Sequence, residues 1–403
     1  MNKAFSFTNI LLPKTEQLDR WAVIACDQFT SDRAYWDRVA ERTDETLSAY
    51  HMVFPEIDLE NAPEERIKKI NKMMTDYVGN GVFTMYPNAF VYVERTLLDG
   101  SIRPGLVGAV DLEQYHYDPM FCPNIGATEQ TILERVPPRI AIRRNAELEF
   151  SHIILFCNDM KNRLFTQILE MKPLLSKLYE FDLMEGGGHI SGWLIDGDNA
   201  VAIREILDNY MESACGTGLL VADGNHSLVT AKCWYEELKT NNPDCDLSDH
   251  PARFAMVELE NIQDPSIQFE PIHRVIFQTD VNKLLEDVNE ICDENGAEIQ
   301  WVVGKQKGTL KVKIGDGELP VAVFQRFLDQ WLANNKGKID YVHDTDAVVN
   351  FAKQDNTIGF LLPVFDKKAL FEFGASGHIL PRKTFSLGHG REKRYYLEGR
   401  LIR

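Results

Sequence analysis

The segment Val221–Ala231, VADGNHSLVTA, is where the sequence shows most directly how this chain folds. The apolar run at residues 218–220 precedes it and predicts a short buried strand. Apolar side chains then recur at the spacing of a helix, at Ala231, Trp234, Tyr235 and Leu238. Residues 223–225, Asp-Gly-Asn, therefore predict a tight turn between the end of a strand and the start of a helix.

The predicted turn has the features of an anion-binding site. Backbone N–H groups at a helix start lack partners within the helix, and the helix dipole adds partial positive charge there, so phosphate is a common ligand. Gly224 lets the backbone approach a ligand because glycine has no Cβ. Asp223 and His226 would place a carboxylate and an imidazole beside the bound group. The alternative is a plain helix cap with a partly buried histidine.

The composition narrows the classes of function. The 403 residues carry a net charge of −18, which argues against a basic surface for nucleic acid. No apolar run is long enough to span a membrane, and the N-terminus lacks the features of a signal peptide. The seven cysteines are scattered without a CxxC pair, as is typical of reduced thiols. We therefore expect a cytoplasmic protein without a nucleic-acid or membrane partner; the sequence indicates no oligomeric state.

Strands and helices alternate irregularly, which predicts a mixed α/β (α+β) fold of mixed sheets flanked by helices. We expect an N-terminal α/β region over residues 1–120, a central region with the Asp-Gly-Asn-His motif over 121–278, and a C-terminal α/β region over 279–403. The periodicity predicts helices over 129–145, 162–179 and 280–295, and strands over 18–25 and 319–322, among others.

Five segments of the chain resemble, in order, segments of the DUF1015 family of bacterial and archaeal proteins. The turn, DGNHS, resembles that family's Asp-Gly-His-His-Arg motif. The other matches are LVGAVDLEQY from Leu106, TEQT from Thr128, PIHR from Pro271 and LPRKTF from Leu380. Arg139 falls near the "DR" that follows the segment matched by TEQT in the family. Asn225, Ser227 and Thr128 depart from the pattern, because the family has His, Arg and His there. The missing arginine would have been a fixed charge for a phosphate oxygen.

The Asp-Gly-x-His turn is also similar to the phosphate-binding motif of the ParB/sulfiredoxin superfamily, which includes free-serine kinases and CTP-binding partition proteins. The resemblance implies a nucleotide whose phosphates lie on the turn, and phosphoryl transfer to a small hydroxyl metabolite such as free serine. ATP and Mg²⁺ would be the cofactors. The alternative is a regulatory protein that binds a nucleotide or phosphometabolite without turnover, and the residues at Asn225 and Ser227 favour it.

Phosphoryl transfer needs cations on the phosphates and a carboxylate that orients the hydroxyl, and the resemblance implies candidates for each role. Phosphate would be bound by Gly224, Asn225, His226 and Ser227, with charge from Arg139, Arg274 and Lys383. Asp223 or Glu129 would hold Mg²⁺, and Asp27 or Glu129 would accept the hydroxyl proton. The catalytic set is thus Asp27, Glu129, Asp223 and His226. Structural alternatives are a turn or cap at Asp27, a capping box at Glu129 and a structural role for His273 and Arg274.

Overall fold

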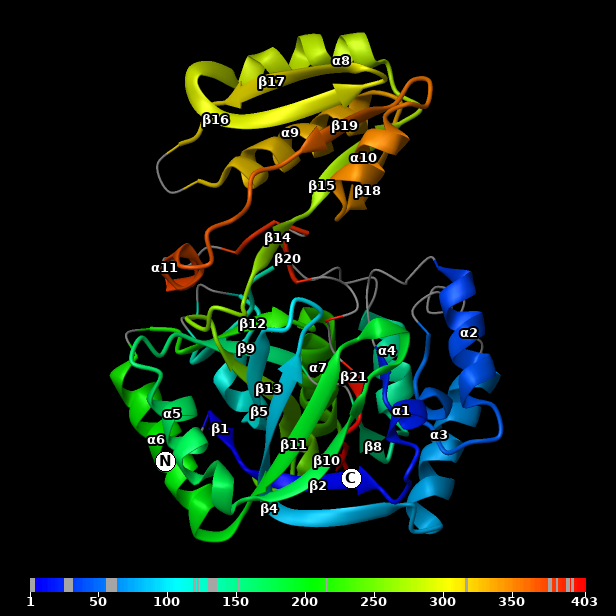
Figure 1. Cartoon of the computed structure of the whole chain (residues 1–403), viewed down its shortest axis with the longest axis vertical. Coiled ribbons are helices and arrows are strands. Elements are labelled where there is room, and N and C mark those ends of the chain that lie inside the picture. The colour runs from blue at the N-terminus through cyan, green and yellow to red at the C-terminus, as the bar shows by residue number, and fades with distance from the viewer. Residues whose placement is uncertain are drawn as a thin grey trace. The chain divides into compact units, whose positions relative to one another are not determined.

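The computed structural model of the chain is shown in Figure 1. It describes residues 4–24, 32–55, 64–118, 121, 123–129, 136–150, 153–214, 216–315, 318–375, 379–381, 383–388, 392 and 395–403. The chain divides into two compact units. The first comprises Met1–Ile267, Gly374–Gly377 and His389–Arg403, and the second comprises Gln268–Phe373 and His378–Gly388. Strands from both the N-terminal and the central predicted region pair within one sheet of the first unit.

That sheet is mixed and has 11 strands in the order β10-β11-β4-β5-β13-β9-β12-β7-β6, with β1 paired to β5 and β2 to β4. Its strands are β1 (Phe5–Ser6), β2 (Thr8–Pro13), β4 (Phe83–Thr96), β5 (Ile102–Asp111), β6 (Tyr115–His116), β7 (Ile125–Gly126), β9 (Ile153–Cys157), β10 (Ser176–Asp182), β11 (His189–Ile195), β12 (Leu219–Asp223) and β13 (Phe254–Asn261). Pairing is parallel along β6-β7-β12 and between β9 and β13, and antiparallel elsewhere. The predicted mixed α+β fold is confirmed.

Helices and two small sheets complete the first unit. The helices are α1 (Leu18–Trp21), α2 (Arg33–Thr43), α3 (Glu64–Gly79), α4 (Val136–Arg143), α5 (Arg163–Met171), α6 (Gly197–Ser213) and α7 (Asn225–Asn241). β3 (Val23–Ile24) pairs with β21 (Tyr395–Tyr396), and β8 (Leu148–Glu149) pairs with β22 (Arg400–Leu401). α4 packs against both α3 and α7, and α5 lies beside α6 (Figure 1). Of the predicted apolar face of α7, Ala231, Trp234 and Tyr235 are buried and Leu238 is half-buried.

Two predicted elements of the first unit are correct in type over only part of their length. The helix predicted over 162–179 ends at Met171, and β10 begins at Ser176. A short 3-10 helix with Pro173 separates them, because proline lacks the N–H that would continue the ladder. The strand predicted over 18–25 is instead the four-residue helix α1, which buries Trp21, followed by the short strand β3.

The helix predicted over 129–145 is shorter where the structure describes it. Residues 130–135 lie outside the described part, and α4 begins at Val136. Pro137 and Pro138 are the second and third described residues of α4.

The second unit contains a five-stranded antiparallel sheet in the order β17-β16-β19-β15-β18. Its elements are β15 (His273–Phe277), α8 (Val281–Asp287), β16 (Cys292–Val303), β17 (Gln306–Val312), α9 (Pro320–Asn334), β18 (Lys338–Val342), α10 (Thr345–Phe351) and β19 (Ile358–Leu361). β14 (Phe269–Pro271) pairs with β20 (Phe385–Leu387), and α11 (Ala369–Ala375) spans the division between the units. Phe324 of α9 packs edge-on against Phe360 of β19 in the core.

Two predictions in the second unit also need correction. The helix predicted over 280–295 ends early, since Cys292 already begins β16. The predicted strand over 319–322 is the start of α9, with Pro320 at the first helical position, where its fixed φ favours the helix. Among the residues that the structure describes, no helix combines the length and the apolar character needed to cross a bilayer.

Candidate functional site

The junction of β12 and α7 is built as the sequence predicts. Gly224 is the N-cap residue of α7 and lies in the left-handed region, with φ 94° and ψ 24°. The first bond inside the helix runs from the Leu228 N–H to the Gly224 carbonyl, at 3.0 Å. Gly224, the N-cap residue, has no side chain that could cap the helix. A helix start of this kind has backbone N–H groups that find no partner within the helix.

The segment that carries Glu129 lies beside this junction. β7 and β12 are parallel neighbours, with Leu219 opposite Ile125, so both strands end at the same edge of the sheet. Thr128, two residues beyond β7, is 4% exposed, and its hydroxyl donates to the Val221 carbonyl at 2.5 Å. The Asn225 amide donates to the same Thr128 oxygen at 3.4 Å.

These contacts place two acidic segments at one edge of the sheet, although 94 positions separate them in the sequence. Asp223 is the last residue of β12, and Glu129 directly follows Thr128; both are half-buried. A register shift between Val221 and Asp223 bends the end of β12 against β9. The arrangement puts two acidic residues next to a helix start. Among the described residues there is no group of three or more His, Cys, Asp or Glu side chains placed to hold a metal.

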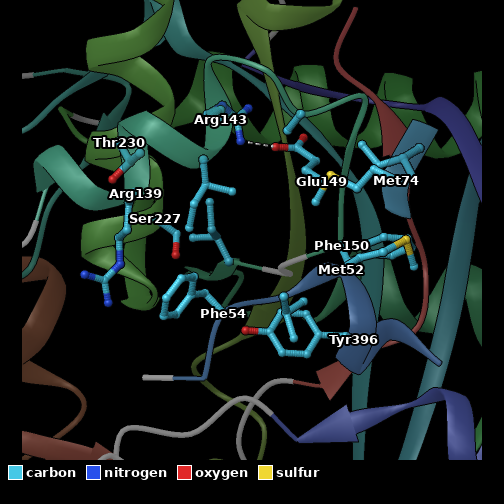
Figure 2. A pocket seen from close by; sticks show the side chains of 15 residues that line it. Met52, Phe54, Met74, Arg139, Arg143, Glu149, Phe150, Ser227, Thr230 and Tyr396 are labelled. Carbon is cyan, nitrogen blue, oxygen red and sulfur yellow. Dashed lines mark ion pairs between the residues drawn. The ribbon is translucent and has the colours of Figure 1, made fainter. Parts of the chain in front are cut away.

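Arg139 lies on α4, the helix that packs against α7, and it lines a cavity that also reaches Ser227 (Figure 2). The cavity has a volume of about 190 Å³. It lies wholly within the first unit. Its lining is formed by Met52, Val53, Phe54, Met74, Arg139, Ile142, Arg143, Ala146, Leu148, Glu149, Phe150, Ile153, Ser227, Thr230 and Tyr396. Of the predicted site residues, Arg139 and Ser227 meet here.

A buried ion-pair cluster closes one side of the cavity. Glu149 contacts Arg143 at 2.7 Å and Arg400 at 2.8 Å, and it accepts the Met256 N–H at 2.8 Å. Burial raises the pKa of Glu149, but the two arginines outweigh burial, so the net pKa is lowered. The carboxylate is therefore charged at neutral pH. Arg144, the residue after α4, also pairs, with Glu237 at 2.8 Å.

The other predicted site residues outside the first unit's described part are Asp27, Arg274 and Lys383. Asp27 lies outside the described residues. Arg274 and Lys383 belong to the second unit. Arg274 is fully buried there: its Nε donates to Gln325 at 2.7 Å and its Nη1 to the Ile272 carbonyl at 2.6 Å. Those contacts agree with the structural alternative, and a phosphate-binding role for Arg274 and Lys383 stays a prediction.

Sequence reasoning missed the cavity residues. Met52, Phe54, Phe150 and Tyr396 come from separate parts of the chain, and no short motif connects them. Their only signal in the sequence is an apolar or aromatic side chain, which is ordinary for a core. The sequence singles out Thr128 because the family has His at that position. Its hydrogen bonds to the turn depend on the pairing of β7 with β12, which no local pattern in the sequence indicates.

A family model described as "Protein of unknown function (DUF1015)" matches residues 5–362. No curated protein matches the chain. Solved structures with a distant likeness include a conserved hypothetical protein from Pyrococcus furiosus, with 11% identity and a TM-score of 0.38, covering 74% of this chain and 95% of that one. A free serine kinase in complex with AMP has 9% identity and a TM-score of 0.39, covering 72% and 90%. SbnI with a C-terminal truncation from Staphylococcus aureus has 9% identity and a TM-score of 0.37, and the match covers 70% of this chain and 82% of that one. These likenesses are too weak to carry a functional argument.

Proposed function

This chain belongs to the DUF1015 family, and we propose that it is a nucleotide-dependent phosphotransferase that acts on a small hydroxyl metabolite such as free serine. The observation that carries the proposal is the junction of β12 and α7. There Gly224 opens a helix start, and Thr128 ties that start to the segment of Glu129. Such a junction supplies an anion site and two carboxylates at one sheet edge, which are parts that phosphoryl transfer requires.

In this proposal the first turn of α7, with Asn225, His226 and Ser227, holds the phosphates of the nucleotide. Arg139 adds positive charge from α4. ATP is the proposed nucleotide.

Mg²⁺ fits the chemistry of the donors at this edge. Asp223, or Glu129 if Asp27 accepts the hydroxyl proton, offers carboxylate oxygens, and Mg²⁺ is usually bound by one or two carboxylates together with substrate phosphates and waters. When bound, the ion would neutralise charge that develops on the transferred phosphoryl group.

Glu129 is the proposed acceptor of the hydroxyl proton, with Asp27 as the second candidate. The hydroxyl oxygen forms a bond to the γ-phosphorus while the bond from that phosphorus to the β–γ bridging oxygen breaks. ADP leaves with the electron pair of the broken bond, and the proton passes to the carboxylate. The product is a phosphomonoester of the metabolite.

A second function is favoured by Asn225 and Ser227. They stand where the related motif has His and Arg, so this turn lacks a fixed charge for phosphate. A regulatory protein that binds a nucleotide or phosphometabolite, without turnover, needs only the helix start.

The deciding experiment replaces Glu129 by its amide. We expect Glu129→Gln to lower product formation from ATP and free serine by about 10²–10⁴-fold, because general-base help is lost. Nucleotide binding, measured by calorimetric titration, should persist because the shape is kept. The matched control is Glu237→Gln, which makes the same change at a glutamate of α7 that pairs with Arg144 on the surface. It should leave both measurements unchanged.

The panel of acceptors should include other small hydroxy compounds beside serine. ATP binding without turnover on any acceptor would replace the kinase proposal by the regulatory one. If neither nucleotides nor phosphometabolites bind the intact chain, both functions are wrong.

A further inference from the structure

The cavity of Figure 2 meets the proposed phosphate site at Ser227 and extends along α7 to Thr230. Ser227 is the third residue of α7, and Thr230 lies three residues further on, so both face the same side of the helix. Both line the cavity. A ligand whose anionic end lies on the first turn of α7 therefore has a hollow directly beside it for its other end.

The walls of this hollow are suited to a flat apolar group. Phe54, Phe150 and Tyr396 contribute aromatic rings, and Met52 and Met74 contribute flexible thioethers that adapt to a ring surface. Aromatic rings bind other rings by offset or edge contacts.

Contacts outside the cavity hold two of the rings in place. The Arg66 guanidinium carbon lies 4.8 Å from the centre of the Phe54 ring. Phe150 packs against Trp21 and Phe83, with ring centres 6.0 and 5.9 Å apart. The wall is thus largely preformed, as is usual in small-molecule sites.

The size of the cavity limits what it accepts. Its volume of about 190 Å³ is below the roughly 300–1,000 Å³ of pockets that enclose a whole ligand. It therefore suits one ring system, with the rest of the ligand outside.

The charges suit a ligand that is also an anion. The charged residues that line the cavity in the described part of the chain are Arg139, Arg143 and Glu149. Glu149 is occupied by Arg143 and Arg400, so it does not oppose an anion as a lone carboxylate would. Arg139 extends at the edge of the cavity on the side of Ser227 (Figure 2).

We infer that this cavity receives the heterocyclic base of the nucleotide, while the phosphates of the same molecule lie on the first turn of α7. The inference rests on the proposed function for its ligand. It adds the part of the site that binds the base, formed mainly by Phe54, Phe150, Tyr396 and Met52.

The test compares ATP with inorganic tripolyphosphate, which has the phosphates but no base. We expect the intact chain to bind ATP more tightly than tripolyphosphate. Phe54→Ala should weaken ATP binding by about tenfold, equivalent to about 1.4 kcal/mol, and leave tripolyphosphate binding unchanged. Phe181→Ala is the matched control. Phe181 is also a half-buried ring, but it lies on β10, at the opposite end of the sheet order from β7, the strand beside the start of α7.

Equal affinities for ATP and tripolyphosphate, or a Phe54→Ala variant that keeps the full affinity for ATP, would overturn the inference and leave the proposed function standing. Failure of the intact chain to bind ATP at all would overturn the proposed function itself. The two failures are therefore distinguishable.

A photolabel gives a second reading that does not depend on how a variant folds. The intact chain is irradiated with 2-azido-ATP, and the labelled peptides are identified by mass spectrometry. Labels on the segments of Met52–Phe54 or Tyr396, competed by ATP, are expected. Competed labels confined to other segments would contradict the inference.

Discussion

Gly224 is the residue on which the junction of β12 and α7 depends. Its φ of 94° lies where a side chain with a Cβ is strained, by about 1–2 kcal/mol for most residues. Glycine also leaves the approach to the first turn of α7 open, so one position serves both the chain path and the proposed ligand.

We therefore predict that Gly224→Val abolishes nucleotide binding. The β-branched side chain strains the turn and crowds the backbone N–H groups. Gly216→Val is the control: Gly216 also has a positive φ, 85°, but nothing lies within 4 Å of an added Cβ. Both variants should lose comparable stability in urea, and only Gly224→Val should lose binding in titration. Unchanged affinity in a folded Gly224→Val chain would mean that the turn only shapes the backbone.

We predict that the free energy of unfolding of the second unit depends on pH through His273. It is 3% exposed; its Nδ1 accepts the Leu362 N–H at 3.1 Å, and its Nε2 lies 3.1 Å from the Thr345 hydroxyl. Burial first, and then the charge of Arg274, lowers the pKa of His273 from 6.5 to about 4. The folded state therefore holds the neutral ring.

Between these two pKa values the imidazole of the unfolded chain binds a proton more readily than the folded one does. The contribution of His273 to the free energy of unfolding is therefore complete above pH 6.5 and is lost as the pH drops from 6.5 towards 4. His273→Asn, whose side-chain oxygen can still accept the Leu362 N–H, should show a smaller dependence. Calorimetric melting at several pH values measures both chains. The same slope in both would show that another group titrates.

At the scale of elements, the parallel pair β7 and β12 brings the Glu129 segment to the start of α7. Thr128 makes this connection with one hydroxyl, which donates to Val221 and accepts from Asn225. The hydroxyl belongs to a buried side chain, so its loss leaves polar groups without a partner in the described structure.

We predict that Thr128→Val destabilises the chain by about 1–3 kcal/mol, because the Asn225 amide loses its acceptor while the shape is kept. Nucleotide affinity should fall as well, since the first turn of α7 is less firmly held. Thr128→Ser retains the hydroxyl and should behave nearly as the natural chain. Urea unfolding and ligand titration are the measurements, and a Thr128→Ser chain as weak as Thr128→Val would point to the lost methyl group instead.

At the scale of the molecule, the second unit is formed by two segments, Gln268–Phe373 and His378–Gly388, that interrupt the chain of the first unit. The last residues of the chain return to the first unit, where β21 pairs with β3 and β22 with β8. Arg400 secures this return: it contacts Glu149 at 2.8 Å and donates to the Phe254 and Pro251 carbonyls at 2.7 and 2.8 Å.

We predict that Arg400→Ala costs about 3–5 kcal/mol of unfolding free energy, the usual effect of breaking a buried pair on one side. Arg144→Ala removes the corresponding exposed pair with Glu237 and should cost about 0–1 kcal/mol. Urea unfolding followed by tryptophan fluorescence compares the two. Equal small losses would show that Glu149 is held by Arg143 alone.

The sequence by itself determined the local structure around Asp223–Ser227 and the mixed character of the fold. An apolar run, a glycine and a helical repeat are short-range signals, and their physical causes act within a few residues. Short-range signals failed where the context is tertiary: β10 was taken for helix, and the start of α9 was taken for strand. At both places proline punctuation or pairing with a distant strand overrides local preference.

Only the tertiary structure decided which distant residues share a site. Strand order places Thr128 against the turn, helix packing brings Arg139 to the cavity of Ser227, and the chain's return places Tyr396 in the same cavity. The division into two units assigns Arg274 and Lys383 to the second. The reason is that strand pairing and side-chain packing join residues far apart in the chain, and no local pattern in the sequence encodes which partners they choose.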